Sequence, residues 1–573
     1  MHIGKRKRIE IERKQITTIA ELQMEVENTF REMLRSNIYD SNGNHTNQQK
    51  QAKRRRELRK ALKTCTFGDW QAKLYIKEYI VDMLIGKFQF KEGDLENFIG
   101  FESGDLSARE KFDILLYQYI QKYESNALIK MIETYKLDAP KVNDDGEAYY
   151  EITDTQIHAM YHRSHMCLDL YDKLQILSQR LYSCYRGNGV IDEIRDMSID
   201  GVSAGVSGIT NNMEVERFGE VRVLPASYES IWLFYKGKSI HLSFLGFESK
   251  KELIRVCKNI YRYNNPGQLS EVRGYIVNEM VDGSRVAVAR PPFCEGWVLF
   301  VRKFHKEMQK DISTLITGNN CMLPIQLMKW LIKGCQVIAI TGEQGSGKTT
   351  LLMSLIRYIR PTYNLRVQEL SFELHLRKIY PKRNIVSFKE TDYVSGVEGL
   401  DFAKKTDGTV SILGEVATAS VASQMIGMSQ VASLFTLFTH HAKTTKDLIY
   451  AMRNALLTEG GFQNETAATR QVVDAIQFDV HMCKHADGHR YIERISQIIP
   501  IRQSIIQTCY RSSKDDDVVE PQFLVSDIVV YEKGRYQLKN PISEEINKQI
   551  LRHLTVSEEE EFIKNQQEWG NVH

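Results

Sequence analysis

Hydrophobic and polar positions divide the chain into stretches of different periodicity. From about residue 15 to 190, apolar residues recur at the three- and four-residue spacing of helices, as in residues 168–181. From about 190 to 300, short β-type runs such as 221–223 and 230–235 alternate with glycine turns and helical pieces such as 250–263. A helix is expected at 325–333, and a strand–loop–helix pattern follows it.

That pattern contains a glycine-rich segment with a specific chemical meaning. An apolar, β-branched run at 335–340 is followed by TGEQGSGKTT at 341–350 and by a helical run at 351–359. This is the motif G-x-x-x-x-G-K-S/T in the context that it requires. Its glycines let consecutive N–H groups point at one phosphate, and the helix N-terminus adds partial positive charge. The predicted nucleotide-binding residues are Gly342, Glu343, Gln344, Gly345, Ser346, Gly347, Lys348, Thr349 and Thr350.

Further groups in the sequence suit the chemistry of a bound nucleotide, with ATP and Mg²⁺ as the expected cofactors. Lys348 would span the β- and γ-phosphates, and Thr349 would offer its hydroxyl to Mg²⁺. Residues 410–415 form a hydrophobic strand that ends in an acid, so Glu415 is expected on the metal shell at the carboxyl end of a sheet strand.

Two other segments hold candidate catalytic side chains. The β-type run 365–374 contains Glu369 and Glu373, either of which could orient water or be a surface carboxylate. The strand expected at 433–439 ends in His440 and His441, candidate sensors of the γ-phosphate, although a histidine there is more often structural.

The order of these motifs resembles the secretion ATPase superfamily, and within it the CpaF-like branch of tight-adherence pilus assembly. In that family, a phosphate loop precedes an acidic box, a strand ending in Gly-Glu and a histidine box. The matching residues here are 369–374, 414–415 and 439–443. The stretches 282–286, 291–292 and 301–304 resemble the part of the family that precedes the motor, and 470–473 and 487–490 resemble the end of the motor domain.

The resemblance implies an α/β fold, in which a RecA-like P-loop NTPase domain follows a smaller α+β (PAS-like) domain and a helical N-terminal region. It implies that Glu373 or Glu369 orients the attacking water and that Arg285 and Arg302 lie near the phosphates. The chain departs from the family where Leu370 replaces an aspartate, where Val-Ala-Thr at 416–418 replaces Val-Arg-Gly, and where Lys443 replaces an asparagine.

Together, the patterns and the resemblance predict five parts. They are a basic, partly disordered arm at 1–60, a helical region at 61–189, an α+β nucleotide-lid domain at 190–310, a RecA-like ATPase motor at 311–512, and a C-terminal linker with a small appendage at 513–573. The appendage is expected to consist of a strand at 523–531 and a helix at 543–554.

The function implied by the resemblance is a cytoplasmic ATP-hydrolysing motor that powers assembly of a pilus or secretion apparatus. Such motors form homo-oligomeric rings, usually hexamers, at the inner face of the cell membrane and act on membrane-embedded platform proteins. Two alternatives of other classes stay open. One is a DNA-translocating or conjugation-associated ATPase, and the other is a nucleotide-gated assembly scaffold without turnover.

Composition changes this interpretation mainly at the N-terminus. With 42% hydrophobic and 26% charged residues, the 573-residue chain is not wholly disordered. A mean hydropathy of -0.37, without an apolar run near twenty residues, argues against a transmembrane helix. Residues 1–63 hold 16 Lys and Arg against 8 Asp and Glu, whereas the remainder carries a net charge of -5. The basic arm could contact an anionic membrane surface. Nucleic acid is a less favoured partner, because no aromatic residues are interleaved with the basic residues of 53–63. The preferred interpretation is a solvated helix face.

The nine cysteines are scattered, odd in number and free of C-x-x-C spacing, which predicts reduced thiols. His481, Cys483 and His485 alternate along a β-type run and would face one side of a strand, where they could bind a transition metal. The resemblance assigns this run to an ordinary hairpin of the motor, which is the interpretation we prefer.

Overall fold

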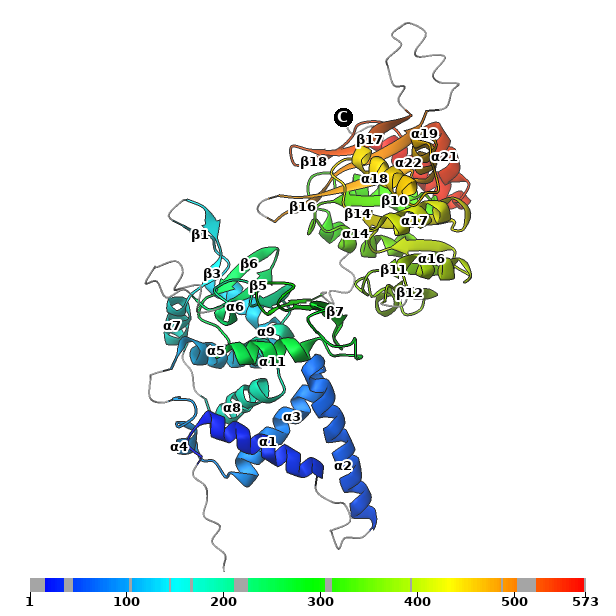
Figure 1. Ribbon diagram of the computed structural model, residues 1–573. Coiled ribbons are helices and arrows are strands. Elements are labelled where there is room, and N and C mark those ends of the chain that lie inside the picture. Colours follow the sequence, from blue (N-terminus) through cyan, green and yellow to red (C-terminus); the bar gives the residue numbers. More distant parts are fainter. Residues whose placement is uncertain are drawn as a thin grey trace, which may run out of the picture. The chain divides into compact units, whose positions relative to one another are not determined.

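The computed structural model describes residues 16–35, 45–101, 106–143, 146–164, 168–210, 225–303, 312–391, 394–485, 488–501 and 522–570. The chain forms two compact units, residues 1–305 and 306–573 (Figure 1). The five-part division expected from the sequence stays a prediction.

The helices of the first unit are α1 (Ile19–Arg35), α2 (His45–Thr64), α3 (Trp70–Asp82), α4 (Glu92–Leu95), α5 (Ala108–Tyr123), α6 (Ala127–Tyr135), α7 (Asp154–Arg163), α8 (Leu170–Tyr185), α9 (Asp192–Asp196) and α11 (Lys250–Ile260). Its strands are β1 (Lys141–Val142), β2 (Ala148–Tyr149), β3 (Glu151–Ile152), β4 (Gly201–Ala204), β5 (Ile231–Tyr235), β6 (Lys238–Leu242), β7 (Tyr275–Glu279), β8 (Arg285–Ala289) and β9 (Val298–Arg302).

Two hydrophobic cores hold the first unit together. One lies among α1, α2, α3 and α8, where the apolar faces predicted by the helical periodicity meet at residues such as Phe30, Ile76 and Leu177. The other joins α5, α6 and α11 to the sheet, through residues such as Leu116 and Val256.

The basic run of the sequence lies on α2. Leu58 and Leu62 face the core with 3% and 5% of their surface exposed. The cations around them are exposed, namely Lys53, Arg54, Arg56, Arg59, Lys60 and Lys63. Helix α2 therefore has the solvated basic face that the sequence favours, while the basic residues at 5–8 lie outside the described part of the chain.

Among the described residues of the first unit, β1 and β2 form a two-stranded sheet, and a larger sheet has seven strands in the order β3-β6-β5-β4-β9-β8-β7. Strand β3 runs parallel to β6, and the remaining neighbours are antiparallel. Along β5, buried and half-buried residues alternate, because one face of the sheet packs on the core. This is an α+β arrangement, and its PAS-like character stays a prediction; the expected β-type run at 221–223 lies outside the described residues.

The helices of the second unit are α12 (Ile312–Leu315), α13 (Met322–Lys333), α14 (Lys348–Leu355), α15 (Leu376–Ile379), α16 (Gly396–Lys404), α17 (Ala419–Val431), α18 (Thr445–Thr458), α19 (Glu465–Ala475), α21 (Glu544–Leu551) and α22 (Val556–Gly570). Its strands are β10 (Ile338–Gly342), β11 (Leu365–Glu369), β12 (Ile385–Lys389), β13 (Val410–Leu413), β14 (Phe435–His440), β15 (Phe478–Lys484), β16 (Arg490–Pro500), β17 (Phe523–Glu532) and β18 (Arg535–Leu538).

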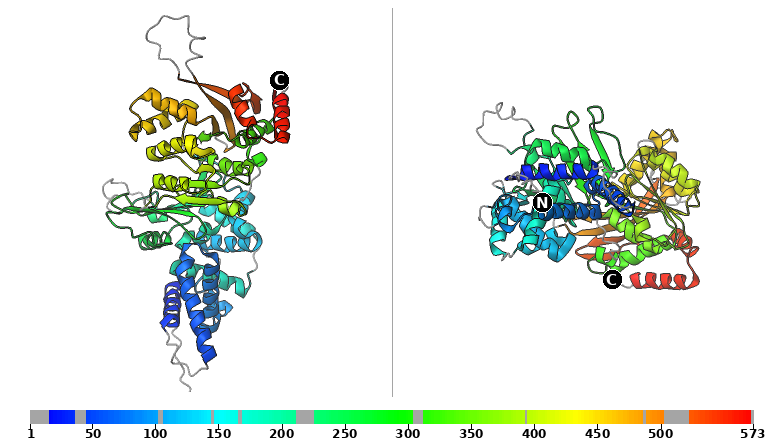
Figure 2. Two further views of the ribbon diagram at one scale, coloured as in Figure 1. Left: turned by 90° about the vertical axis from the view of Figure 1, so that its right-hand side faces the viewer. Right: turned by 90° about the horizontal axis from the view of Figure 1, so that it is seen from below.

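These nine strands form one sheet in the order β12-β11-β13-β14-β10-β15-β16-β17-β18. The strands from β12 to β15 are parallel, and those from β15 to β18 are antiparallel. Figure 2 shows α17–α19 in yellow and α21–α22 in red on opposite sides of the sheet. Every residue of β10, β11 and β13 is buried, as expected for parallel strands covered on both faces. This mixed α/β unit fits a RecA-like P-loop domain.

The C-terminal residues pack into the second unit. Strand β17 pairs with β16, and β18 pairs with β17. Helix α22 lies on α13, where the Phe562 and Trp330 ring centroids are 5.5 Å apart. Glu558 accepts bonds from Lys333 Nζ at 2.6 Å and from Arg360 Nη2 at 2.7 Å. The pattern predicts an appendage here, but residues 523–570 share the sheet and core of the phosphate-loop strand.

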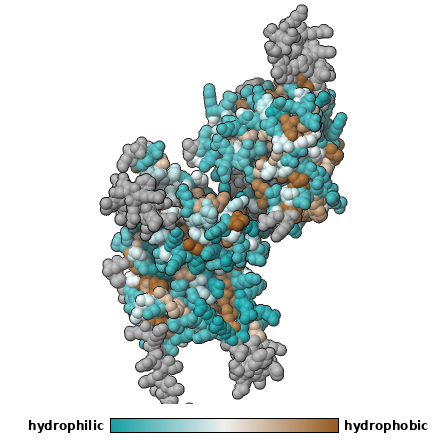
Figure 3. Space-filling view, viewed as in Figure 1, coloured by the Kyte–Doolittle hydropathy of each residue, from teal (hydrophilic) through white to brown (hydrophobic). Residues whose placement is uncertain are grey.

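None of the helices among the described residues combines the length and apolar composition that a bilayer-spanning segment needs. On the face drawn in Figure 3, hydrophobic residues are dispersed among hydrophilic ones. The cysteines of the described ranges are free, and Cys167 and Cys509 lie outside those ranges.

Replacing Phe562 by alanine should lower the free energy of unfolding of the second unit by about 3–5 kcal/mol, because its ring is 1% exposed and leaves a cavity against Trp330. Ile563→Ala is the matched control, since Ile563 is 42% exposed and should change stability by less than about 0.5 kcal/mol. Chemical denaturation of the full chain measures both values. Equal effects of the two changes would contradict the packing of α22.

Candidate functional site

The predicted phosphate loop lies at the carboxyl end of β10, between β14 and β15. Gly342, Gly345 and Gly347 have φ values of 135°, 78° and 100°, a region that favours glycine. A Cβ on Gly342 would lie 2.1 Å from the carbonyl oxygen of Met482 in β15. Helix α14 begins at Lys348, so the loop joins the strand end to a helix N-terminus as the motif predicts.

Side chains of the loop divide into exposed and buried positions. Glu343, Gln344 and Gly345 are exposed, Ser346 and Lys348 are buried, and Gly347, Thr349 and Thr350 are half-buried. Lys348 Nζ donates to the carbonyl oxygens of Gly342 at 2.8 Å and Glu343 at 2.9 Å. The ammonium group therefore lies within the curl of the loop, where it can reach a bound phosphate.

Lys348 also meets the histidine and the acid that the sequence singles out. Its Nζ lies 3.3 Å from His441 Nδ1, and His441 Nε2 lies 3.2 Å from Glu415 Oε1. Burial lowers the pKa of Lys348 to about 8, while the charge of Glu415 acts in the opposite direction. The side chains of Glu415 and His441 are 40% and 45% exposed, so solvent and ligands can reach them. The structure thus brings three predicted residues together.

His440 has a different environment from its neighbour. Its Nδ1 lies 2.8 Å from the carbonyl oxygen of Val416, and burial lowers its pKa. The Val416 amide donates to the carbonyl oxygen of Thr439 at 2.9 Å. His440 thus joins the ends of β13 and β14, whereas His441 is directed at Lys348 and Glu415.

The two glutamates of the acidic box also differ. The β-type run predicted for 365–374 ends at Glu369, because the chain turns there. Glu369 is 3% exposed, and its Oε1 accepts from the amides of Glu373 at 2.9 Å and Leu374 at 2.8 Å. Glu373 is half-buried and accepts from Ser371 Oγ at 3.1 Å. Glu369 holds the turn, and a Cβ on Gly414 would lie 3.2 Å from Glu369 Cγ, so the turn adjoins the Glu415 segment.

Arg285 and Arg302 lie in the first unit as direct cross-strand partners on β8 and β9. Residues directly opposite in an antiparallel pair share one face of the sheet, and like charges so placed repel each other. The role near the phosphates that the resemblance implies for this pair stays a prediction.

Several polar side chains beside the glycine-rich loop are not among the site residues predicted from the sequence. Thr341 Oγ1 donates to Asp479 Oδ1 at 2.6 Å, and Thr445 Oγ1 donates to Asp479 Oδ2 at 2.7 Å. Asp479 is fully buried, and burial raises its pKa. Arg490 Nε donates to the carbonyl oxygen of Gly345 at 2.9 Å. A lone acid inside the apolar run 478–482 is the signal that could have pointed to Asp479.

The site fits the expected cofactors. Positive-φ glycines, a helix N-terminus and the Lys348 ammonium group are features that bind phosphates. The Thr349 hydroxyl and the Glu415 carboxylate are oxygen ligands of the kind that Mg²⁺ takes.

No protein-family model matches the chain, and no curated protein matches its sequence. Similar solved structures include the VirB11 ATPase from the Brucella suis type IV secretion system in complex with sulphate (18% identity, covering 52% of this chain and 89% of that chain, TM-score 0.28). A second is the Legionella pneumophila ATPase DotB, with 15% identity, covering 65% of this chain and 84% of that chain, at a TM-score of 0.37. A third is the pilus retraction motor PilT with bound ADP, with 13% identity, covering 65% of this chain and 88% of that chain, at a TM-score of 0.37. At these TM-scores, the likeness carries no functional assignment.

Replacing Gly342 by alanine should abolish nucleotide binding, because the new Cβ collides with the Met482 carbonyl oxygen and moves the loop. Gly345→Ala is the matched control: it also has positive φ, but a Cβ there has no atom within 4 Å, so it should cost only about 1–2 kcal/mol of backbone strain. Titration with a fluorescent ADP analogue measures both variants. Tight binding by Gly342→Ala would refute the close approach of β15.

Proposed function

We propose that the chain is an ATPase, hydrolysing ATP to ADP and phosphate with Mg²⁺. The observation that carries this proposal is the contact chain from Lys348 through His441 to Glu415 beside a glycine loop. Phosphate binding by itself needs the loop and the lysine, whereas turnover also needs a metal-holding acid and a group that responds to the γ-phosphate. All four lie at one edge of the parallel sheet.

In this proposal, each residue has a separate task. The loop amides of 342–347 and Lys348 bind the phosphates, and Thr349 and Glu415 hold Mg²⁺. His441 is placed to report on the γ-phosphate, since it contacts both Lys348 and Glu415. Glu415 also balances the charge of Lys348 at the loop.

Glu373 is the proposed water-positioning carboxylate, and Glu369 is a positioning residue that acts through it. A water-orienting carboxylate needs an oxygen that water can reach, which suits the half-buried Glu373 better than Glu369, which is 3% exposed. One carboxylate oxygen of Glu369 accepts hydrogen bonds from two backbone amides of the turn that carries Glu373.

The proposed biological role is that of a motor for pilus assembly or secretion of the type II/type IV kind, with the CpaF-like branch as the proposed affiliation. The order of motifs supports it. A homohexameric ring is proposed because a rotation-related, heterologous interface closes into a ring. The proposed partners are membrane-embedded platform proteins at the inner membrane face, reached from the cytoplasm. DNA-stimulated turnover would favour the DNA-translocating alternative, and tight ATP binding without turnover would favour the scaffold.

Replacing Lys348 by alanine should lower ATP turnover at least about 100-fold, because it removes the cation aimed into the loop. Lys446→Ala, which changes an exposed lysine on α18, is the matched control and should keep wild-type turnover. Phosphate release from the full chain measures both. Undiminished turnover in Lys348→Ala would refute the ATPase proposal.

Replacing Glu373 by glutamine should lower the turnover rate roughly 100- to 1,000-fold while ATP binding is retained, because the amide is a poor proton acceptor for water. Glu369→Ala should instead lower the melting temperature, since the turn loses the acceptor of two amide bonds. Glu459→Gln, at an exposed position, is the control. Full turnover in Glu373→Gln, with loss in a stably folded Glu369→Ala, would reverse the two roles.

A further inference from the structure

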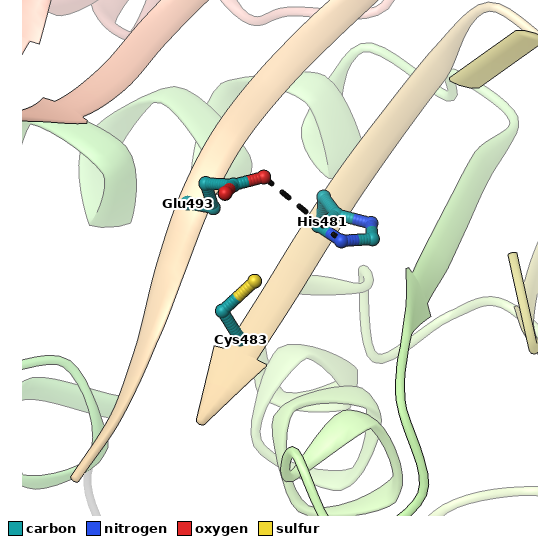
Figure 4. A group of neighbouring side chains, drawn as sticks. All are labelled: His481, Cys483 and Glu493. Carbon is teal, nitrogen blue, oxygen red and sulfur yellow. Dashed lines mark ion pairs between the residues drawn. The ribbon is translucent and has the colours of Figure 1, made fainter. Parts of the chain in front are cut away.

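Three side chains with metal-binding atoms converge between β15 and β16. Figure 4 shows His481 and Cys483 on β15 and Glu493 on β16 pointing toward one another. One ligand atom of each lies within 4.8 Å of the others. His481 is buried, and Cys483 and Glu493 are half-buried, so the cluster is open to solvent on one side.

A β-bulge brings Glu493 into the cluster. Residue His481 pairs with Arg494, but the next pair along the strands is Met482 with Ile492, so Glu493 is the extra residue. A bulge redirects a side chain that regular pairing would send to the other face. Glu493 is thereby directed at His481 and Cys483, and His481 Nε2 lies 4.0 Å from Glu493 Oε2.

The other ring nitrogen of His481 is fixed by a buried hydrogen-bond chain. His481 Nδ1 lies 2.8 Å from Thr341 Oγ1, which donates its one hydrogen to Asp479. Nδ1 must therefore donate to Thr341, which leaves the Nε2 lone pair directed at the cluster. Metal-binding histidines are oriented by the same kind of bond.

We propose that His481 Nε2, Cys483 Sγ and a Glu493 oxygen bind one transition-metal ion of the zinc class, with water in the fourth position. Nitrogen, thiolate and carboxylate donors suit Zn²⁺, and three protein ligands with one open position form a known coordination pattern. Bonds of about 2.0–2.3 Å would place the ligand atoms roughly 3.5 Å apart, which side-chain rotations can reach from the observed spacing.

Charge is balanced at such a site. Cys483 loses its thiol proton to solvent when the metal binds, so thiolate and carboxylate together offset the charge of Zn²⁺. Glu493 also pairs with Arg494. The pair uses Oε2, the same oxygen that lies 4.0 Å from His481 Nε2, so metal binding requires the carboxylate to turn Oε1 toward the metal while Oε2 keeps Arg494.

The sequence pattern suggests His485 as the third metal-binding residue beside His481 and Cys483, whereas in the structure the third residue is Glu493. His485 is not part of the converging group, and its ring stacks on Tyr491 with centroids 4.5 Å apart. The metal would join β15 to β16, and β15 is the strand whose carbonyl oxygen packs on Gly342.

The test uses the full chain after chelation and dialysis, with Zn²⁺ and Co²⁺ as probes. We expect one Zn²⁺ per chain by mass spectrometry, and a Co²⁺ complex with the near-ultraviolet charge-transfer band of a thiolate ligand. Cys483→Ser should lose the band and bind the metal at least about 100-fold more weakly, and Glu493→Gln should weaken binding at least about tenfold. Zn²⁺ should raise the melting temperature of the wild-type chain but not of Cys483→Ser.

Two control variants separate this cluster from other metal-binding groups. Cys321→Ser changes another half-buried thiol of the second unit and should keep both the metal and the band. Glu415→Gln changes the carboxylate next to His441 and should keep them as well. The proposal is overturned if the wild-type chain binds no Zn²⁺, if Cys483→Ser keeps the band, or if Glu415→Gln loses the metal. These readouts do not depend on ATP turnover.

Discussion

Strand β10 lies between β14 and β15, and its last residue, Gly342, has no room for a side chain because a Cβ would lie 2.1 Å from the Met482 carbonyl oxygen. Packing of backbone on backbone at this point fixes where the loop leaves the sheet. The buried bond from Thr341 to Asp479 fixes the preceding residue to the same neighbouring strand. The loop therefore begins from a rigid support, and its amides and Lys348 take their direction from that support.

The rest of the site follows from parallel pairing. Carboxyl ends of parallel strands share one edge, so residues 341–348, Glu369, Glu415 and His441 meet although up to 100 positions separate them in the sequence. Helix α14 presents its N-terminus at the same edge. Buried Lys348 therefore lies 3.3 Å from His441, and the charge of Glu415 acts on it.

Local spacing made the phosphate loop predictable from the sequence, because every group of that motif lies within ten residues of its neighbours. The roles of Glu369 and Glu373 were not separable, since the difference between them comes from a turn that ends β11 at Glu369. Asp479 was missed because its partners, Thr341 and Thr445, come from distant elements.

For the C-terminal residues too, the sequence predicts the elements but not the parts of the chain that they contact. The strand and helix patterns at 523–531 and 543–554 correspond to β17 and α21, yet their place was predicted as an appendage. Pairing of β17 with β16, and packing of Ile550 where Gly334 leaves space, are contacts between residues far apart in the chain. Periodicity reports which face of an element is buried, but not what buries it.

Thr341 connects the strand that carries the glycine-rich loop to the cluster of His481, Cys483 and Glu493. Its one hydroxyl hydrogen goes to Asp479, and its oxygen accepts from His481, so neither bond can change without rearranging the other. Movement of β10 would turn the His481 ring, and a ligand on Nε2 of that ring would in turn restrain β10. Because burial makes each lost bond costly, a change in the orientation of Asp479 or of His481 would have to be accommodated at this one oxygen atom.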